Sequence, residues 1–421
     1  MAEKFRLYLA ELRERLWVKP LIACILSIIA ALIADMADEI WLGHGVPNIT
    51  QESAEDLLKI IAASMLVIAT FAVASMVAAY ASTGNNATPR AFPLIIADDV
   101  SQNALSTFIG AFIFSIVALT ALMNSYYGRA GRFTLFVLAL LVLGFVIFTF
   151  LRWVDRIARL GRLGAIIDRV EAATAASLHR RRCAPRLRGM AVHGNGADGH
   201  AIYAEAVGYV QHIDMAALQK YAEESQTRIV VAALPGTFTA PGRALAYVHP
   251  DARITEKGLG KIASAFLIRD DRRFDDDPRF GLVVLSEIAS RALSPAVNDP
   301  GTAIDIIGTY VRLFVQWAKP LEKDEEQAGC HDRVEVPSLY VHDMFDDAFS
   351  AIARDGAGMV EVCVRLLKGL DALARIGDPA LREAAIRHGR LARERAEDAL
   401  SHLEDLKAIR NASAFCNEGP T

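Results

Sequence analysis

Cysteine is scarce in this 421-residue chain, and no two of its five cysteines form a CxxC pair. The scattered spacing argues against a disulfide framework or a zinc ribbon and is typical of a reducing compartment. The net charge of −4 gives no support for nucleic-acid binding. The chain also lacks a GxxxxGK phosphate loop, a GxSxG turn and an HExxH helix. Since no nucleophile, base and orienting group come together, an enzyme is the least favoured class, no catalytic residue is assigned, and no cofactor is identified.

Charge is missing from four long apolar stretches that fill most of the first 151 residues, namely 20–34, 60–89, 100–128 and 133–151. A helix needs roughly 20 mostly apolar residues to cross the hydrocarbon core of a bilayer. The sequence therefore predicts four transmembrane helices and a lipid bilayer as the first partner. The first helix is extended to 17–41, which places Trp17 and Trp41 near the two interfaces.

Lysine and arginine gather at the two ends of this region. Five precede the first span, none lies between Asp35 and Asp56, and five arginines lie between Arg152 and Arg169. By the positive-inside rule, the N-terminus and the C-terminus both lie in the cytoplasm. The expected location is a bacterial inner membrane, crossed several times.

The remaining 270 or so residues have the texture of an α+β region. We expect a membrane α-helical part followed by a small β-barrel-like segment and a helical bundle. The expected divisions are a cytoplasmic tail (1–16), a four-helix transmembrane domain (17–151), a juxtamembrane stalk helix (152–186), a small β-rich domain (187–250), a helical cytoplasmic domain (251–414) and a disordered tail (415–421).

Within these divisions, periodicity predicts individual elements. The expected strands are 201–206, 208–213, 228–233 and 244–249, with a helix at 215–224. The later helices are expected at 254–268, 281–293, 302–317, 342–353, 359–375 and 379–411, with a polar break at 319–337. An apolar stripe beginning at Trp153 predicts that the fourth span continues as the stalk, which either packs on the soluble part or pairs with itself in an oligomer. The run Arg180 to Arg182 is interpreted as a basic cluster that faces anionic lipid headgroups.

Four phrases carry a resemblance to a known family. They are NATPRA from Asn86, QNALSTFIG from Gln102, GYVQHID from Gly208 and RALSPAVNDPGTA from Arg291. In this order and spacing they resemble the domain of unknown function 2254 family of bacterial predicted membrane proteins. The resemblance covers nearly the whole chain and implies a membrane location; it implies no activity, ligand or catalytic residue.

The last of these phrases holds the candidate ligand site. Asp299 suits an N-cap, Pro300 the first helical position and Thr302 the first turn of a helix. The alternative is that Arg291, Asn298, Asp299 and Thr302 form a polar pocket for an anion or another polar ligand.

Small residues line one face of each of two spans. The faces comprise Ser64, Ser75 and Ser82 on the second span and Thr107, Ala111 and Ser115 on the third. Such faces let helices pack closely, and they are also compatible with a pore. Because no ionisable residue lies in mid-span, packing is the favoured interpretation.

Two polar clusters in the soluble part receive simpler interpretations. The loop from His193 to His200 contains His and Asp but is interpreted as a flexible turn, and no metal site is assigned. The aspartates at 270, 271, 275, 276 and 277 do not have the spacing of a calcium loop and are interpreted as a solvated loop between helices.

The sequence therefore predicts a membrane-anchored homo-oligomer that acts as a sensor or scaffold, with a cytoplasmic region that binds a ligand or a protein partner. The alternative is a passive, channel-like conduit for ions or small solutes. Four spans without a charged mid-span residue are too few for a typical self-contained transporter.

Overall fold

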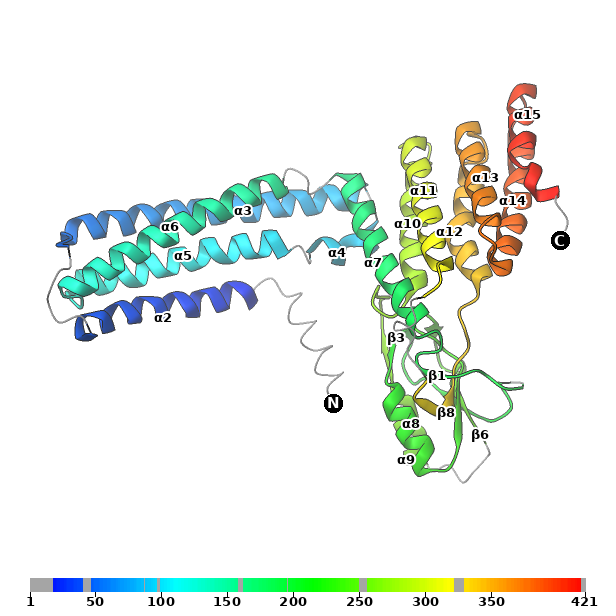
Figure 1. Cartoon of the computed structure of the whole chain (residues 1–421), viewed down its shortest axis with the longest axis horizontal. Helices are drawn as coiled ribbons and strands as arrows, with labels where there is room; N and C mark the ends of the chain where they lie inside the picture. The colour runs from blue at the N-terminus through cyan, green and yellow to red at the C-terminus, as the bar shows by residue number, and fades with distance from the viewer. Residues whose placement is uncertain are drawn as a thin grey trace. The chain divides into compact units, whose positions relative to one another are not determined.

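A computed structural model of the chain describes residues 18–40, 47–86, 88–96, 99–157, 162–194, 196–249, 256–321 and 329–417 (Figure 1). The chain divides into two compact units, residues 1–166 and 167–421, which we call the N-terminal unit and the C-terminal unit. The predicted tail 1–16, together with Trp17 and Trp41, lies outside the described residues.

The N-terminal unit is made of helices. They are α2 (Val18–Ile40), α3 (Gln51–Asn86), the short η1 (Pro89–Ala91) and α4 (Phe92–Ile96), α5 (Asp99–Met123) and α6 (Arg129–Ile157). Three of them, α3, α5 and α6, are long and apolar enough to cross a membrane. The apolar stretch found in α2, Val18–Ile29, is shorter, so the predicted count of four spans stays a prediction.

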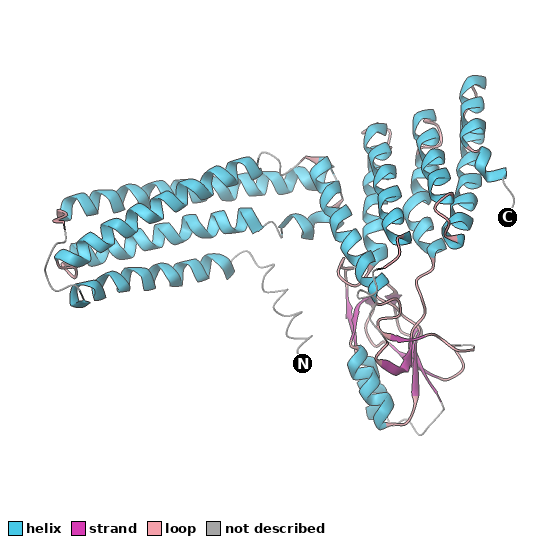
Figure 2. Ribbon diagram, in the orientation of Figure 1, coloured by secondary structure: helices cyan, strands magenta, loops and turns pink. Residues whose placement is uncertain are grey.

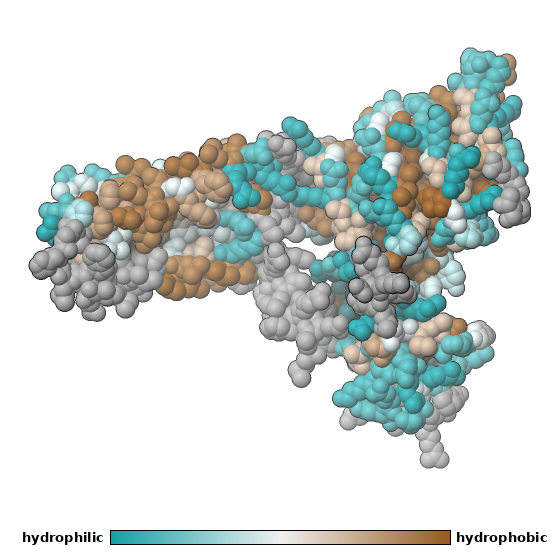
Figure 3. All heavy atoms as spheres, in the orientation of Figure 1, coloured by the Kyte–Doolittle hydropathy of each residue, from teal (hydrophilic) through white to brown (hydrophobic). Residues whose placement is uncertain are grey.

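Aromatic and small residues build the core of this unit. Trp153 of α6 is fully buried, and its ring lies 6.1 to 6.3 Å from the rings of Phe71, Phe108 and Phe150. The helix that was expected to leave the bundle at residue 151 thus stays in it to Ile157, because Trp153 packs inward. Figure 3 shows apolar side chains over much of the outer surface of these helices, as lipid contact requires.

Helices α2 and α5 approach each other closely through small residues. A Cβ on Gly110 would lie 3.1 Å from the Cβ of Ala23. The hydroxyl of Ser27 donates to the carbonyl oxygen of Gly110 at 2.8 Å. Helices in a membrane associate through such close packing of small residues and interhelical hydrogen bonds, because lipid provides no hydrophobic driving force between them.

The C-terminal unit contains two sheets (Figure 2). The strands are β1 (Gly189–Met190), β2 (His200–Tyr203), β3 (Gly208–Ile213), β4 (Arg228–Val231), β5 (Phe238–Thr239), β6 (Ala244–His249), β7 (Phe266–Arg269) and β8 (His331–Glu335). One sheet has the order β1-β8-β4-β6-β2 and the other β5-β3-β7. Strand β8 is parallel to β1 and β4, and the other pairings are antiparallel.

Helices α8 (Met215–Glu224) and α9 (Glu256–Ala263) contribute apolar residues to the core of the sheets. Helix α8 begins after Asp214, whose carboxylate accepts a hydrogen bond from the backbone N–H of Ala217 at 3.0 Å. The predicted helix 215–224 and the predicted strands 208–213 and 244–249 are confirmed to the residue.

Four expectations for this region are wrong. The described strands form two open sheets, so the barrel-like segment is not found. Residues 266–269 are strand β7 rather than helix. A short apolar run is compatible with a helix or a strand, and here the pairing with β3 makes it a strand. The polar break contains strand β8, in which Val334 and the ion-paired Glu335 are buried. The predicted boundary at 250 also fails, because β7 and β8 complete sheets that begin before it.

The remaining helices form a bundle. They are α7 (Leu163–Cys183), α10 (Pro278–Ala292), α11 (Pro300–Ala318), α12 (Val341–Asp355), α13 (Val360–Ala374), α14 (Pro379–Ala399), α15 (Leu403–Ala412) and the short η2 (Ala414–Asn417). Rings of Phe314, Phe345 and Phe349 stack in their core with centroids 4.4 to 5.8 Å apart. The imidazole of His388 packs against Phe345 and Phe349, and burial lowers its pKa to about 4.

Two predicted ranges at the C-terminal end are corrected. The helix expected at 379–411 is two helices, and the turn between them lets α15 contact α13. Residues expected in a disordered tail are partly ordered: Phe415 and Cys416 are buried in η2 against Gly389.

Helix α7 is separate from α6 and packs on the bundle through buried Val170, Thr174 and Ser177. It approaches α10 closely at Gly281, where an added Cβ would overlap the hydroxyl of Thr174.

Candidate functional site

The predicted site at the start of α11 forms a helix cap. The carboxylate of Asp299 accepts hydrogen bonds from the backbone N–H of Thr302 at 3.1 Å and from its hydroxyl at 2.6 Å. These donors hold the pKa of Asp299 below its usual value. The side chains of Arg291 and Asn298 are exposed, and Asn298 has a φ of 51°. Asp299 and Thr302 are thus brought together, and binding of a ligand by the four residues stays a prediction.

The predicted small-residue faces of the spans divide between the interior and the surface. Ala111 and Ser115 of α5 are buried, while Thr107 is half-buried and donates to the carbonyl of Asn103. On α3, Ser64 is exposed and Ser75 half-buried, and the side chain of Ser82 lies outside the described part. The inward face of α3 consists of other residues, namely Ala54, Leu58, Ile61, Met65, Ala69, Ala72 and Met76.

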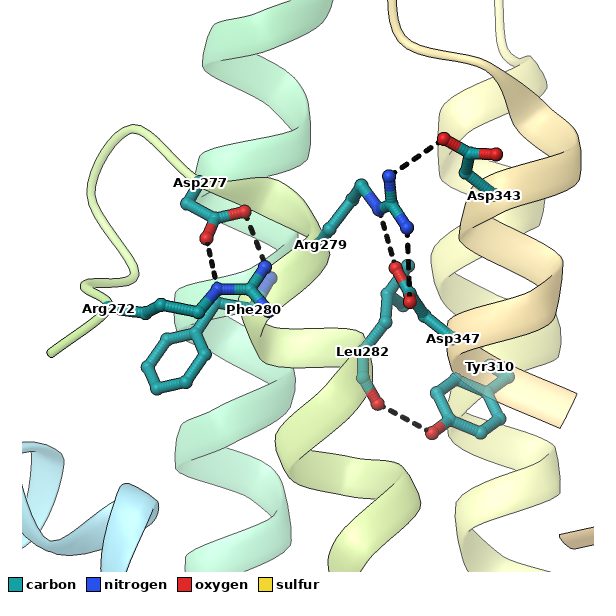
Figure 4. A network of polar contacts seen from close by, with 8 residues as sticks. All are labelled: Arg272, Asp277, Arg279, Phe280, Leu282, Tyr310, Asp343 and Asp347. Atoms are coloured by element: carbon teal, nitrogen blue, oxygen red, sulfur yellow. Dashed lines mark hydrogen bonds and ion pairs between the residues drawn. The ribbon is translucent and has the colours of Figure 1, made fainter. Parts of the chain in front are cut away.

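The best-organised polar group in the C-terminal unit surrounds the start of α10 (Figure 4). The guanidinium of Arg272 donates to the carboxylate of Asp277 at 2.7 Å and lies over the ring of Phe280. Asp277 also caps α10 by accepting from the backbone N–H of Phe280 at 3.2 Å. The side chain of Asp277 is 3% exposed and that of Arg272 is 18% exposed, so the pair is largely desolvated. Burial raises the pKa of Asp277 despite the nearby guanidinium.

A second arginine connects α10 with α12. Arg279 donates to the carboxylate of Asp347 at 2.6 and 3.2 Å and to that of Asp343 at 2.8 Å. Figure 4 shows its side chain reaching from one helix to the other. Burial lowers the pKa of Arg279, but the bonds to Asp347 and the charges of both aspartates more than offset this and raise it. Such a bidentate arrangement fixes the guanidinium in place.

A pocket of about 410 Å³ lies beside this network. We call it the arginine pocket. Its charged lining residues are Arg243, Arg272, Arg279, Asp277 and Asp343, and its exposed aromatic side chains are Phe238 and Tyr340. The turn after β4 forms one wall. There Gly236 has a φ of 91°, and a Cβ at this position would overlap the carboxylate of Asp277, so glycine is required.

The acidic loop was expected to be solvated, and Asp270, Asp271 and Asp275 are exposed, but its last two aspartates are a structural part of this site. Asp277 is buried, and Asp276 forms a 2.6 Å contact between its carboxylate and Nδ1 of His212. Burial raises the pKa of Asp276, but the bond to His212 leaves it below its usual value. The loop is held because α7 and β3, which are distant in the sequence, contact it.

The basic run that was expected to face lipid is also explained differently. Arg181 is buried and donates to the carbonyl of Asp276 at 3.0 Å, while Arg180 donates to the carbonyl of Asp275. Arg182 donates to the carbonyls of Gln316 and Lys319 at the end of α11. These arginines therefore satisfy carbonyl groups of the C-terminal unit itself.

The histidine loop has a structural partner. The backbone N–H of His193 donates to the buried carboxylate of Glu335 at 2.9 Å, and Glu335 also pairs with Arg228. In the described part of the chain, no group of three or more His, Cys, Asp or Glu side chains could hold a metal ion.

Sequence reasoning missed Arg272, Asp277, Arg279, Asp343 and Asp347. One signal was available, because an Asp-Pro pair precedes three helices in the same way: Asp277 begins α10, Asp299 begins α11 and Asp378 begins α14. Asp at the N-cap followed by Pro is a local preference that can be read from sequence. The partners of Asp277 carry no such signal.

The sequence profile of a family described as "Predicted membrane protein (DUF2254)" matches residues 13–372. An uncharacterized protein of Mycobacterium tuberculosis, MT1328, is 29% identical over 119 residues, which cover 26% of this chain and 22% of the relative. The uncharacterized protein Mb1321c of Mycobacterium bovis matches with the same identity and coverage. The chain thus spans about a fifth of the length of these relatives. No solved structure matches the chain significantly.

Proposed function

From the premise that the chain belongs to the DUF2254 family of predicted membrane proteins, we propose that it is a membrane-anchored sensor. In this proposal the C-terminal unit binds a small organic monoanion that carries a planar or apolar portion. The observation that carries the proposal is the arginine pocket.

The charges of the pocket support an anion of low charge. Three arginines and two aspartates line it, which leaves one net positive charge when all five groups are ionised. Arg243 forms no ion pair with a described residue and donates to the carbonyl of Phe238 at 2.8 Å, so its guanidinium keeps donors for a ligand. A carboxylate would meet this group, and its apolar portion would contact Phe238 and Tyr340.

The pocket also lies where separate segments of the chain meet. Its walls come from the turn after β4, the start of α10 and the start of α12. Arg279 couples α10 to α12, and α10 packs on α7 at Gly281. Helix α7 begins in the last residues of the N-terminal unit and continues into the C-terminal unit. A ligand that changes the pairing of Arg279 therefore acts on a continuous packed route to α7.

Ligand binding can be measured on the full chain in detergent micelles. In a Cys24→Ser, Cys330→Ser background, the remaining thiols Cys183, Cys363 and Cys416 are all buried, so a thiol-reactive dye reports unfolding on heating. We expect an aromatic carboxylate to stabilise the C-terminal unit, by about 2.7 kcal/mol at 100 times its Kd, while the uncharged amide of the same compound does not.

Two arginine variants make the measurement specific. Arg243→Gln removes the exposed guanidinium from the pocket and should abolish the stabilisation by the carboxylate. Arg269→Gln is the matched control, since Arg269 is also exposed and also contacts a carbonyl oxygen but does not line the pocket. Equal stabilisation of both variants, or no stabilisation by any aromatic or aliphatic carboxylate, would contradict the proposal.

For the N-terminal unit we propose four spans in a bacterial inner membrane, with both termini in the cytoplasm and assembly into a homo-oligomer. The support is the distribution of lysine and arginine around the apolar stretches. The exposure of Ser64 on α3 is compatible with contact between copies.

The alternative function is a passive conduit. Its support also comes from α3, because Ser64 is exposed and Ser75 is only half-buried within one chain. A conduit would then form between copies. Ser75→Cys, with Cys24 replaced, should react rapidly with a small charged thiol reagent if this face lines water. We expect it to be inert, because Ser75 is half-buried on α3 rather than exposed. Rapid labelling together with a conductance in planar bilayers would favour the conduit instead.

A further inference from the structure

A second pocket of about 450 Å³ lies between α7 and α11, away from the residues of the arginine pocket. We call it the Trp317 cleft. Its lining residues are Ala175, Ala176, Leu178, His179, Arg182, Gln316, Trp317, Lys319, Pro320 and Leu321. The volume is within the range of pockets that bind small molecules in proteins.

Among the described residues that line the cleft, the charged groups are all cationic. Its titratable lining residues are His179, Arg182 and Lys319, and no described residue in the lining is a carboxylate. The ammonium group of Lys319 is exposed and has no ion pair with a described residue. The arginine pocket, by contrast, contains two aspartates, so the Trp317 cleft suits a ligand with more negative charge.

Arg182 does not depend on a ligand for its position. Arg182 donates to the carbonyls of Gln316 and Lys319, which fixes its guanidinium at the end of α11. Farther back along the two helices, Arg312 of α11 pairs with Glu171 of α7 at 2.6 and 2.7 Å. The walls of the cleft are thus held together by contacts outside it, as in a preformed site.

Trp317 adds a recognition element of another kind. Its half-buried indole lines the same cleft as the two cationic side chains and the amide of Gln316. An aromatic face stacks on planar or apolar groups, while arginine and lysine bind phosphate oxygens. We propose that the Trp317 cleft binds a phosphate group joined to a planar or apolar portion, either a soluble phosphate monoester or the headgroup region of an anionic phospholipid.

Occupancy of the Trp317 cleft can be measured by acylation of Lys319. An amine-reactive reagent is applied to the full chain, and the labelling of Lys319 is quantified by mass spectrometry. Lys220, an exposed lysine of α8 that lies outside the cleft, is the internal control. In nanodiscs of phosphatidylcholine, adenosine monophosphate should reduce labelling of Lys319 at least fivefold, and adenosine should not. If the source is lipid, the same protection should appear without nucleotide in nanodiscs that contain phosphatidic acid.

A matched pair of substitutions tests whether protection arises in the cleft. Ala172 and Ala176 are both exposed on α7, one helical turn apart, and only Ala176 lines the cleft. Ala176→Asp should raise the concentration of nucleotide or acidic lipid needed for half-protection about tenfold, and Ala172→Asp should leave it unchanged. Labelling of Lys319 that is equal under every condition, or that responds equally in both variants, overturns the proposal. Failure of the carboxylate assay at Arg243 would leave this result unaffected, because the two sites share no residue.

Discussion

Replacing Asp277 by asparagine separates its two structural roles. An asparagine oxygen can still accept the backbone N–H of Phe280, so the cap of α10 is kept. The charge that pairs with Arg272 is lost. Breaking a buried ion pair by removing one partner costs about 3–5 kcal/mol. Because Arg272 is 18% exposed and can regain some solvent, we expect Asp277→Asn to lower the free energy of unfolding by about 2–4 kcal/mol.

Asp299→Asn is the matched control, since Asp299 caps α11 through the same Asp-Pro pair but accepts hydrogen bonds from Thr302 and Gly301 rather than from an arginine. Its effect should stay within about 0.5 kcal/mol, while Asp299→Ala should cost about 0.5–2 kcal/mol through loss of the cap. The unfolding midpoint of both variants is measured from the reaction of the buried thiols with the dye in the Cys24→Ser, Cys330→Ser background. For a unit of this size, about 2–4 °C per kcal/mol places the Asp277→Asn midpoint roughly 4–16 °C below that of the parent.

A double variant tests whether the loss arises from the stranded guanidinium. Arg272→Met in the Asp277→Asn chain removes the unpaired charge and keeps an apolar side chain over Phe280, so part of the stability should return. If Asp277→Asn and Asp299→Asn lower the midpoint equally, or if the double variant is the least stable of the set, the ion pair does not stabilise this unit and the reasoning fails.

Three further predictions follow from other parts of the chain. Gly281→Ala should destabilise the C-terminal unit by about 1–3 kcal/mol in the same thiol assay, because its Cβ would overlap Thr174; an unchanged midpoint would mean that α7 does not pack there. His388 is neutral in the folded protein, where its pKa is about 4 against 6.5 in an unfolded chain. The neutral imidazole therefore contributes fully to the free energy of unfolding above pH 6.5, and this contribution is lost as the pH falls toward 4. His388→Gln should therefore flatten the acid side of the stability profile by up to about 3 kcal/mol, and a profile as steep as that of the parent would refute the assignment. A reporter fused at Thr421 should be cytoplasmic and one inserted at Gly45 periplasmic; periplasmic activity at Thr421 would contradict the four-span topology.

In the candidate sites, neighbouring residues in the sequence were enough to predict a helix cap but not an ion pair. Asp299, Pro300 and Thr302 were recognised as a helix start because a cap involves only residues three positions apart. The same logic could have identified Asp277, whose loop was instead interpreted as solvated. The arginine that pairs with Asp277 lies nearby at Arg272, but the loss of solvent that makes the pair important comes from Gly236 and other distant residues.

Strand β8 illustrates the opposite limit. Its sequence, HDRVE, has no clear apolar alternation and lies in a segment rich in charge. It becomes a strand because β4, about a hundred residues earlier, pairs with it in parallel, and because Arg228 compensates the buried charge of Glu335. A strand that depends on a distant partner and on a charge pair has little intrinsic signal.

The sequence by itself determined the apolar helices of the N-terminal unit, the family and the helix caps. Each of these depends on the transfer of a continuous segment out of water or on hydrogen bonds between near neighbours, which the residues of that segment settle alone. Only the tertiary structure decided that Arg180 to Arg182 satisfy carbonyls of the C-terminal unit, that Asp277 of the acidic loop is buried, and that Arg182 and Trp317 share a cleft. The free energy of a charge depends on its solvent and its partner, and both are fixed by segments that lie far apart in the sequence and meet only when the chain folds.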